Sequence, residues 1–432
     1  MVEARNQQVA ISGVTVIDGT GRPPLSDAVV IVEGERITAV GPRASVEIPT
    51  GEEIIDGNGR FLLPGLIDCH VHIYASEFVP VPPKGSEEAY AGVVAMNNLR
   101  SALQAGTTTV RDVSAGHINL AMRTAIERVA MLGPRCFVAG RGICMTGGHG
   151  SGEARLGTGV HEVDGPDAIR HAIREEAKAG ADLIKVLTSH RSENPEYTQE
   201  ELNVATEEAH RFDMKVAVHA GNYATTRMAA IAGMDTIEHG IAIDEETADM
   251  MAEKGIVLIP TLWILNDIFA ETKALKAKYE QIGEYRHHPN HGWMEETLRV
   301  YTVLLDQLPK TMKIVRARDI RIAAGTDNVR ASVPFAMLHK EIEYLTKYGL
   351  SPMEAIESAT RMGAEAIGGQ DDFGTVEAGK YADLIMVDRD PLKDITALGE
   401  VCWVMKEGDV IPLHPEWARR PIRDPLNTSL ED

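Results

Sequence analysis

The sequence predicts an α/β protein with two parts, a (β/α)8 TIM barrel and a small β-sandwich-like domain. Two observations lead to this prediction. The middle of the chain alternates short apolar runs with helical patterns, as parallel βα units do. Both ends of the chain contain short β patterns punctuated by Gly and Asp. We therefore assign residues 61–366 to the barrel, and residues 1–60 together with 367–432 to the small domain.

The expected small domain takes its strands from both termini. Near the N-terminus the β patterns are QVAISGVTVIDG (8–19), AVVIVEGERITAVG (28–41) and EEIIDGNGR (52–60). Near the C-terminus they are GTVEAGKYADLIMVDRDP (374–391) and VCWVMKEGDVI (401–411). Gly and Asp between apolar residues are typical of hairpin turns. We expect the two ends to meet in one β domain.

The expected barrel contains eight strands. Helical patterns separate most of them, as at residues 168–180 and 198–213. Eight strands with helical crossovers over about 300 residues are typical of a (β/α)8 barrel, which carries its chemistry at the carboxyl ends of its strands. The predicted strands are 60–73, 107–114, 135–143, 181–189, 215–220, 235–240, 255–262 and 320–327.

Composition narrows the choice of partners. A formal net charge of −21 would repel phosphate backbones and anionic membranes, so we expect neither nucleic acid nor a membrane as partner. The sequence has no apolar run near the length of about 18 residues that a membrane helix requires, and it starts without a signal-peptide pattern. The four cysteines are scattered and form no C-x-x-C pair. We expect a cytoplasmic homo-oligomer that acts on a small molecule.

Polar side chains occupy the ends of several predicted barrel strands. The stretch LIDCHVHIY (66–74) ends an apolar strand with His70 and His72, whose spacing places both on one face. Each such residue has a structural explanation when taken alone, because a His can be a core residue, a Lys can extend to solvent and an Asp can cap a helix. Their convergence on one barrel mouth favours a metal site. The other members are Lys185, His219, His239 and Asp327, at or near the ends of the fourth, fifth, sixth and eighth strands.

With this ordered set the chain resembles the amidohydrolase superfamily, of the kind with a binuclear metal centre. The resemblance covers essentially the whole chain, from PGLIDCHVH (64–72) to GTVEAGKYADLIMVD (374–388). The branch that it resembles most is imidazolonepropionase-like and contains Xaa-Pro dipeptidases, aryl-amide hydrolases and phenylurea hydrolases. The segment TGGHG (146–150) supports that branch. The resemblance implies a metal-dependent hydrolase that cleaves an amide-type C–N bond.

The resemblance also implies two divalent metal ions, most readily zinc, with Mn²⁺ or Co²⁺ as substitutes. The two ions would activate water and polarise the carbonyl group. An ammonium group beside two dications would be repelled, so Lys185 is expected as an anionic carbamate shared by both ions. Asp327 would also move the proton to the leaving nitrogen. By resemblance one ion is held by His70, His72 and Asp327, and the other by His219 and His239.

Four further histidines and one cysteine lie outside this ligand set but close to it or clustered in sequence. His149, in the TGGHG segment after the third strand, polarises the substrate carbonyl by resemblance; the alternative is a solvated loop histidine. Cys69 should point away from the ligands and into packing. The cluster of His287, His288 and His291 fits no closed metal site, and we interpret it as part of a polar insertion loop.

The substrate stays open among N-acyl amino acids, Xaa-Pro dipeptides, aryl amides and phenylureas. Dipeptidase-like relatives tend to carry Tyr two residues after the fifth-strand His, where this chain has Gly221. On the strand-end loops an Arg would suit a carboxylate, and a Trp would suit an aromatic ring. The candidate substrate-binding residues are Arg191, Tyr223, Trp263 and Arg330.

Three other functions compete with amide hydrolysis. A deaminase of the same fold would need a Glu in an H-x-x-E motif, and Asn222 at that position cannot carry a proton. A Schiff-base lyase would use Lys185 as its nucleophile, and would leave four histidines and an aspartate without a role. An inactive scaffold is disfavoured because all six expected ligands are present.

Overall fold

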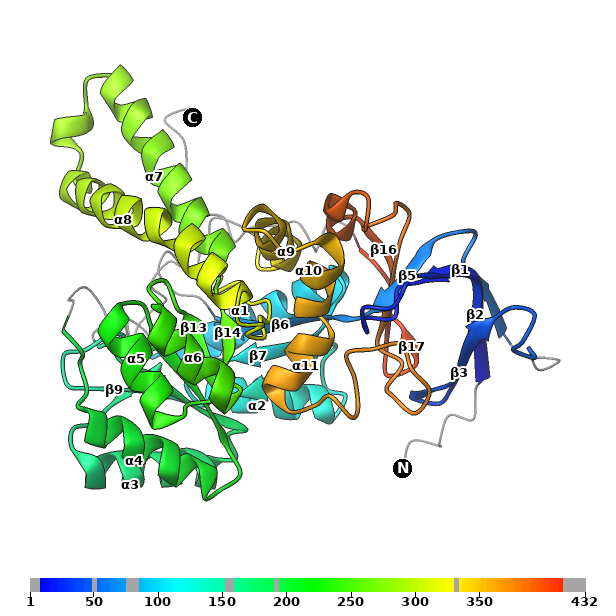
Figure 1. The fold of residues 1–432 in the computed structure, drawn as a ribbon, viewed down its shortest axis with the longest axis horizontal. Helices are drawn as coiled ribbons and strands as arrows, with labels where there is room; N and C mark the ends of the chain where they lie inside the picture. Colours follow the sequence, from blue (N-terminus) through cyan, green and yellow to red (C-terminus); the bar gives the residue numbers. More distant parts are fainter. Residues whose placement is uncertain are drawn as a thin grey trace.

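The structure is a computed structural model that describes residues 8–48, 53–74, 85–151, 159–189, 194–329 and 334–414. It has a strand-rich part, formed by the two ends of the described chain, and a larger part in which parallel strands alternate with helices (Figure 1). The strands form one mixed sheet and two parallel sheets. The predicted α/β class is therefore confirmed.

The mixed sheet combines early and late strands of the chain. They are β1 (Gln8–Val16), β2 (Leu25–Glu33), β3 (Arg36–Pro42), β4 (Glu53–Asp56), β5 (Phe61–Pro64), β15 (Leu384–Val387), β16 (Val401–Lys406) and β17 (Asp409–Val410). Their order is β17-β16-β15-β5-β1-β2-β3, and β4 pairs with β1. The antiparallel pair β5–β15, with Leu62 opposite Met386, joins the two ends of the chain.

The two parallel sheets occupy the middle of the chain. One has the order β6-β7-β8, with β6 (Leu66–Val71), β7 (Thr107–Asp112) and β8 (Arg135–Val138). The other has the order β10-β9-β11-β12-β13-β14. Its strands are β9 (Gly142–Cys144), β10 (Val160–Glu162), β11 (Leu183–Leu187), β12 (Lys215–Ala220), β13 (Thr236–His239) and β14 (Val257–Ile259).

Helices connect these strands and begin and end with clear local signals. α4 starts with a capping box between Thr198 and Glu201, and α3 ends at Gly180 in the left-handed conformation that Gly tolerates. Their bounds are α1 (Glu87–Gln104), α2 (Ile118–Glu127), α3 (Pro166–Ala179), α4 (Gln199–His210), α5 (Tyr223–Ala232), α6 (Glu245–Lys254), α9 (Leu338–Lys347), α10 (Pro352–Ser358) and α11 (Arg361–Ile367). A 3-10 helix, η2 (Ile395–Gly399), precedes β16.

The predicted eighth strand, residues 320–327, was wrong as a full strand, because it makes one isolated bridge, between Leu258 and Ile322. Two contacts explain the irregular backbone. At Gly325 the chain comes so close to β6 that an added Cβ would lie 2.7 Å from the Cβ of His70. The main-chain N–H of Thr326 donates to the side chain of Asp68 instead of to a neighbouring strand.

Main-chain hydrogen bonds nevertheless connect the two parallel sheets. The N–H of Asp182, just before β11, donates to the carbonyl oxygen of Val138 in β8 at 2.8 Å. On the far side, residue Ala324 accepts from the N–H of Cys69 in β6 at 2.9 Å, and Ala323 donates to Leu258 of β14 at 3.0 Å. These bonds place the carboxyl ends of the parallel strands on the same side of the molecule.

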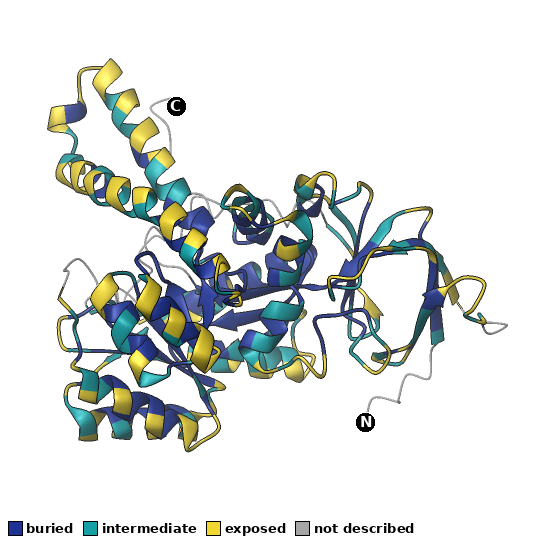
Figure 2. Cartoon of the chain, in the orientation of Figure 1, coloured by how far each residue is buried: buried dark blue, intermediate teal, exposed yellow. Residues whose placement is uncertain are grey.

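A helical hairpin, which we call the arm, projects from the body of the protein (Figure 1). It consists of α7 (Leu262–Gln281), the 3-10 helix η1 (Tyr285–His287) and α8 (His291–Arg316). Most of its outer part is exposed (Figure 2). Residues 282–290 connect α7 and α8 through turns and η1, as expected for a polar loop around His288, whereas His291 begins α8. Within the described residues, no helix is long and apolar enough to cross a membrane.

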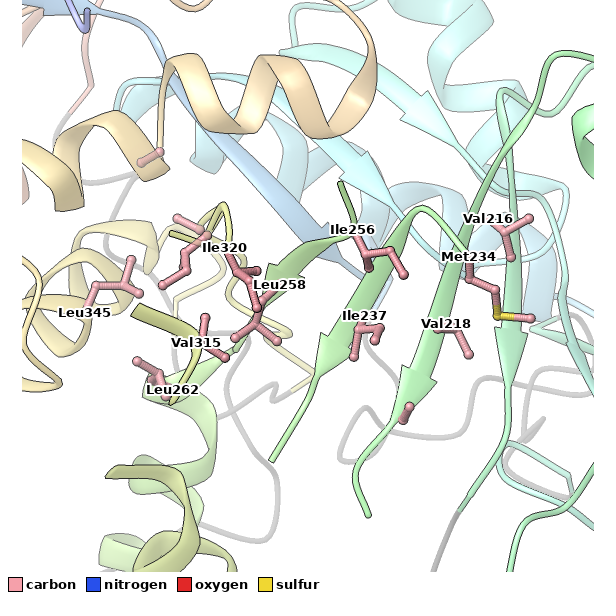
Figure 3. Packing of buried hydrophobic residues seen from close by; sticks show 14 of the residues in the cluster. Val216, Val218, Met234, Ile237, Ile256, Leu258, Leu262, Val315, Ile320 and Leu345 are labelled. Carbon is pink, nitrogen blue, oxygen red and sulfur yellow. The ribbon is translucent and has the colours of Figure 1, made fainter. Parts of the chain in front are cut away.

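The main core lies between the parallel strands and the surrounding helices. On β12 the side chains of Val216 and Val218 are buried in this core, together with Ile237 of β13 and Leu258 of β14 (Figure 3). Because side chains alternate along a strand, His219 lies on the opposite face of β12, toward the interior of the strand assembly. Burial of the valines thus fixes which residues face the interior.

Candidate metal centre

His70, His72 and Asp327 form a compact group at the end of β6. The Nε2 atoms of His70 and His72 lie 3.5 Å and 3.3 Å from Oδ1 of Asp327. One ligand atom from each residue lies within 4.8 Å of the other two. Among the described residues this is the one group of three or more His, Cys, Asp or Glu that is tight enough to hold an ion. Two imidazoles and a carboxylate suit a divalent transition metal.

Lys185, His219 and His239 come from the neighbouring strands β11, β12 and β13. Lys185 and His219 emerge on the same face, because Leu187, two residues after Lys185, pairs with His219. The ring of His239 lies 4.5 Å from that of His219 and 5.1 Å from that of His70, measured between centroids. The strand-end histidines therefore line one interior.

His239 and Asp327 have left-handed backbone conformations, with φ of 66° and 50°. Such values are uncommon for residues other than Gly and are concentrated at functional sites. In an extended strand, Glu238 and His239 would point to opposite faces. Here β13 ends in a left-handed turn at His239. The side chains of Glu238 and His239 are both buried, and both contact His70.

Glu238 and Arg111 are functional residues that the sequence prediction missed. Oε2 of Glu238 accepts a hydrogen bond from Nδ1 of His70 at 2.6 Å. Oε1 accepts from Arg111 Nη2 at 2.7 Å and from the Thr236 hydroxyl at 2.5 Å. Glu238 and Arg111 are both buried, and Arg111 also donates to the carbonyl oxygen of Cys69 at 2.6 Å. The signal in the sequence is a pair of charged residues within apolar strands, in VRDV (110–113) and TIEH (236–239).

Asp68 links the two segments that carry His70, His72 and Asp327 by hydrogen bonds. Its Oδ1 accepts from the N–H of Thr326 at 3.0 Å, and its Oδ2 accepts from the Thr326 hydroxyl at 2.8 Å. Burial raises the pKa of Asp68 to about 7, although these hydrogen bonds lower it. Asp68 precedes His70 by two residues and Thr326 precedes Asp327. The pair therefore sets the spacing between two candidate ligands.

The buried histidines favour the neutral imidazole, which is the metal-binding form. Burial lowers the pKa of His70 to about 3 and that of His239 to about 4, and it lowers the pKa of His219 well below its usual value. The charge of Lys185 adds to the effect on all three. His72 differs: burial lowers its pKa, but Asp327, Asp112 and the Ser114 carbonyl group together outweigh burial and raise the pKa of His72. A positive charge on the His72 imidazole is therefore stabilised by the neighbouring Asp327 carboxylate.

Three of the histidines have a hydrogen-bond partner at Nδ1, so Nε2 is the ring nitrogen that can bind a metal ion. Nδ1 of His72 donates to the carbonyl oxygen of Ser114 at 2.9 Å, and Nδ1 of His70 donates to the Glu238 carboxylate. Nδ1 of His239 lies 2.8 Å from the Thr261 hydroxyl. Such partners orient metal-binding imidazoles in proteins. The donor set, its burial and these orienting contacts fit a metal centre.

Lys185, Asp327 and His149 differ in how their surroundings affect them. Lys185 is almost completely buried, and burial lowers the pKa of its amine to about 8. Burial raises the pKa of Asp327, but the histidines around it lower that pKa further, so the group stays ionised. The ring of His149 stacks on that of His219 at 4.2 Å. The main-chain N–H of His149 donates to Glu196 at 3.0 Å, which holds the TGGHG loop against the site.

The structure places the candidate substrate-binding residues in different surroundings. Tyr223, at the start of α5, is 48% exposed, and its hydroxyl accepts a hydrogen bond from Gln307 of α8 at 2.7 Å. Trp263 is 3% exposed and packs in the main core, so it does not lie on an open loop as expected. Arg191 and Arg330 lie outside the described residues.

Two other expectations concern residues near the site. The side chain of Asn222 accepts from the N–H of Thr225 at 2.9 Å, so it caps α5 and takes the place that a deaminase would give to its acid. The thiol of Cys69 is buried and donates to the carbonyl oxygen of Gly363 at 3.6 Å, on the packing side of β6.

Comparison with known proteins agrees with this arrangement. A family model described as the amidohydrolase family matches residues 61–411. An ochratoxinase from Aspergillus niger is 28% identical over 418 residues, which cover 89% of this chain and 82% of that protein. An imidazolonepropionase from Rhizobium rhizogenes is 24% identical over 414 residues, 84% of this chain and 87% of that protein. The solved structure of a Xaa-Pro dipeptidase with bound methionine in its active site matches with a TM-score of 0.82 at 29% identity, over 94% of this chain and 100% of that chain.

Proposed function

Because this chain belongs to the amidohydrolase family and is a hydrolase of amide-type C–N bonds, we propose that it works with a binuclear metal centre. The centre is built from His70, His72, Lys185, His219, His239 and Asp327. Two divalent ions, zinc in our proposal, would activate water and polarise the scissile carbonyl group. The observation that carries this proposal is the convergence of His70, His72 and Asp327, with ligand atoms within 4.8 Å of one another.

Lys185 would serve as a carboxylated ligand shared by both ions. Only a neutral amine attacks CO₂, forming an N–C bond and releasing a proton. A pKa of about 8 leaves roughly a tenth of the side chain as free amine near neutral pH, far more than an exposed lysine with a pKa near 10.4 would have. The buried position also keeps water away from the product.

Asp327 and His149 would act on the substrate. The Asp327 carboxylate, kept ionised by its histidine neighbours, would accept a proton from the attacking water at an Oδ atom and pass it to the leaving nitrogen. His149, stacked on His219 at the mouth of the site, would donate a hydrogen bond to the substrate carbonyl oxygen.

We also propose that the two parallel sheets together form the (β/α)8 barrel of residues 61–366. The bonds from Asp182 to Val138, from Cys69 to Ala324 and from Ala323 to Leu258 support this, because they connect β8 to the start of β11 and connect β6, through residues 323–324, to β14. Most strands of the mixed sheet would then belong to a small domain of residues 1–60 and 367–432, whereas its strand β5 (Phe61–Pro64) falls within the range predicted for the barrel. A cytoplasmic location and a homo-oligomeric state remain part of the proposal, and light scattering of the purified protein tests the latter.

The substrate would be an amide drawn from N-acyl amino acids, Xaa-Pro dipeptides, aryl amides and phenylureas. The relatives support this range, since one is an ochratoxinase and another a Xaa-Pro dipeptidase. The test is a screen of purified protein, stripped of metal and reloaded with Zn²⁺, Mn²⁺ or Co²⁺, against these four classes. Elemental analysis of the active form should give two ions per chain. One ion or none in fully active protein would contradict the binuclear centre.

A further inference from the structure

Thr261 is the partner of His239, and it sits in an unusual backbone position. Its hydroxyl lies 2.8 Å from Nδ1 of His239, and the residue is fully buried. Its φ of 48° is left-handed, which is rare for a β-branched residue. Thr261 is also the residue directly before α7 (Leu262–Gln281), where a Thr side chain ordinarily caps its own helix. Its side chain makes no capping bond to α7.

Glu341, from α9, takes over the capping role. Its Oε1 accepts from the N–H of Leu262 at 3.0 Å, and its Oε2 accepts from the N–H of Trp263 at 2.7 Å. These are the first two N–H groups of α7, which bonds within the helix cannot satisfy. Glu341 is fully buried. A buried carboxyl group requires such partners. Burial raises the pKa of Glu341 to about 8, and the two N–H groups of α7 oppose this shift because they stabilise the carboxylate.

Packing fixes α9 against the arm, so this cap is rigid. Leu345 of α9, Leu262 of α7 and Val315 of α8 belong to the same buried cluster and lie near one another in Figure 3. Glu341 and Leu345 are one helical turn apart and therefore share a face of α9. The face that packs on the arm is thus the face that caps α7.

We propose that Glu341 is a positioning residue for His239. By capping α7 it frees the Thr261 hydroxyl and holds the strained Thr261 backbone, and Thr261 in turn fixes the ring of His239. The inference rests on the proposed function, in which His239 is a metal ligand. It adds a chain of contacts, from α9 through α7 to the metal centre, that links the arm to the chemistry.

The test compares Co²⁺ binding by metal-free protein carrying Glu341→Gln, Thr261→Val, both substitutions, or Thr261→Ser. A Gln side chain has one acceptor oxygen, so its NH₂ group would face a helix N–H, and Thr261 would return to capping α7. Titration with Co²⁺ gives the affinity, and the visible absorption of the bound ion reports the ligand geometry. Both readouts are independent of turnover. Glu343→Gln is the matched control, because Glu343 lies on the same helix and pairs with Lys340.

We expect Glu341→Gln and Thr261→Val each to weaken Co²⁺ binding by about tenfold or more and to change its visible spectrum. The double variant should be no weaker than Thr261→Val alone, because both act through one hydroxyl. Thr261→Ser and Glu343→Gln should match the wild-type protein.

Two results would overturn the inference. Wild-type affinity and spectrum in Glu341→Gln, with lower stability, would show that Glu341 only supports the fold. Additive losses in the double variant would show that Glu341 acts without Thr261. If Glu341→Gln does not fold, Glu341→Asp replaces it in the same cycle, since Asp keeps both acceptor oxygens at shorter reach. A wild-type protein that binds no Co²⁺ would instead contradict the proposed function itself.

Discussion

Replacement of Glu238 by Gln tests how the metal centre is supported. Glu238 accepts hydrogen bonds from His70 through one oxygen, and from Arg111 and Thr236 through the other. Gln is nearly the same size but has one acceptor and one donor group. If its oxygen faces Arg111, its NH₂ group faces Nδ1 of His70. That contact requires the His70 tautomer with a proton on Nε2, which cannot bind metal.

The alternative orientation of Gln is no better. Its oxygen then keeps His70 in place, but its NH₂ group faces the Arg111 guanidinium, which is 2% exposed and loses its counter-charge. Breaking a buried ion pair from one side costs about 3–5 kcal/mol. Loss of a partner that orients a metal-binding His costs about 10–100-fold in metal affinity. Glu238→Gln should therefore lower stability, metal affinity, or both.

The assay separates these two effects. Urea unfolding of the metal-free protein gives the stability, and competition with a chelator gives the affinity for Zn²⁺. Glu246→Gln is the control, since Glu246 pairs with Arg227 on the surface and both side chains are largely exposed. That control should change neither quantity. A Glu238→Gln protein with wild-type stability and wild-type zinc affinity would refute the reasoning.

Three further predictions concern single groups of the centre. Lys185→Ala should lose activity and at least one metal ion, with partial recovery when short-chain carboxylates are added; an active, metal-loaded crystal with an unmodified amine would contradict this. Asp327→Asn should lose about 10²–10⁴-fold in rate on an amide, and less on a matched aryl ester whose leaving group needs no proton; equal losses would make Asp327 a ligand only. Burial lowers the pKa of His239 to about 4, below its unfolded value near 6.5, so the unfolded chain binds more protons between these values. The metal-free protein should lose up to about 3 kcal/mol from this group as pH falls from 6.5 to 4, and His239→Asn should show a smaller loss in the same urea titration.

The sequence predicted the candidate ligands because their signal is local. His70 and His72 are two residues apart at the end of one apolar run, and the residues after His219 and His239 mark strand ends. Periodicity and turn residues are sufficient to place such positions. Most of the strand positions were predicted for the same reason, since each apolar run is short and bounded by Gly, Asp or Pro.

The contacts between distant segments were not predictable in this way. Arg111 and Glu238 lie on different strands, and no spacing rule connects them before the sheets are assembled. Residues 320–327 have a strand-like pattern, but the approach of Gly325 to His70 and the Asp68–Thr326 bonds replace regular pairing. The hairpin of α7 and α8 was not predicted, because the pairing of two helices across a polar, His-containing segment leaves no spacing signal in the sequence.

The mixed sheet has a consequence for how the protein is made. Its strand β5 leaves the ribosome long before β15, the strand that pairs with it. Arg60 and Asp388, which form an ion pair beside this junction, are 328 residues apart. Until then the nascent chain exposes an open strand edge next to Leu62, and such edges promote aggregation. The hairpins β1–β2 and β2–β3 can form locally, whereas the pairing of β5 requires the distant strand β15. Truncation before β15 should therefore harm solubility more than deletion of a surface loop.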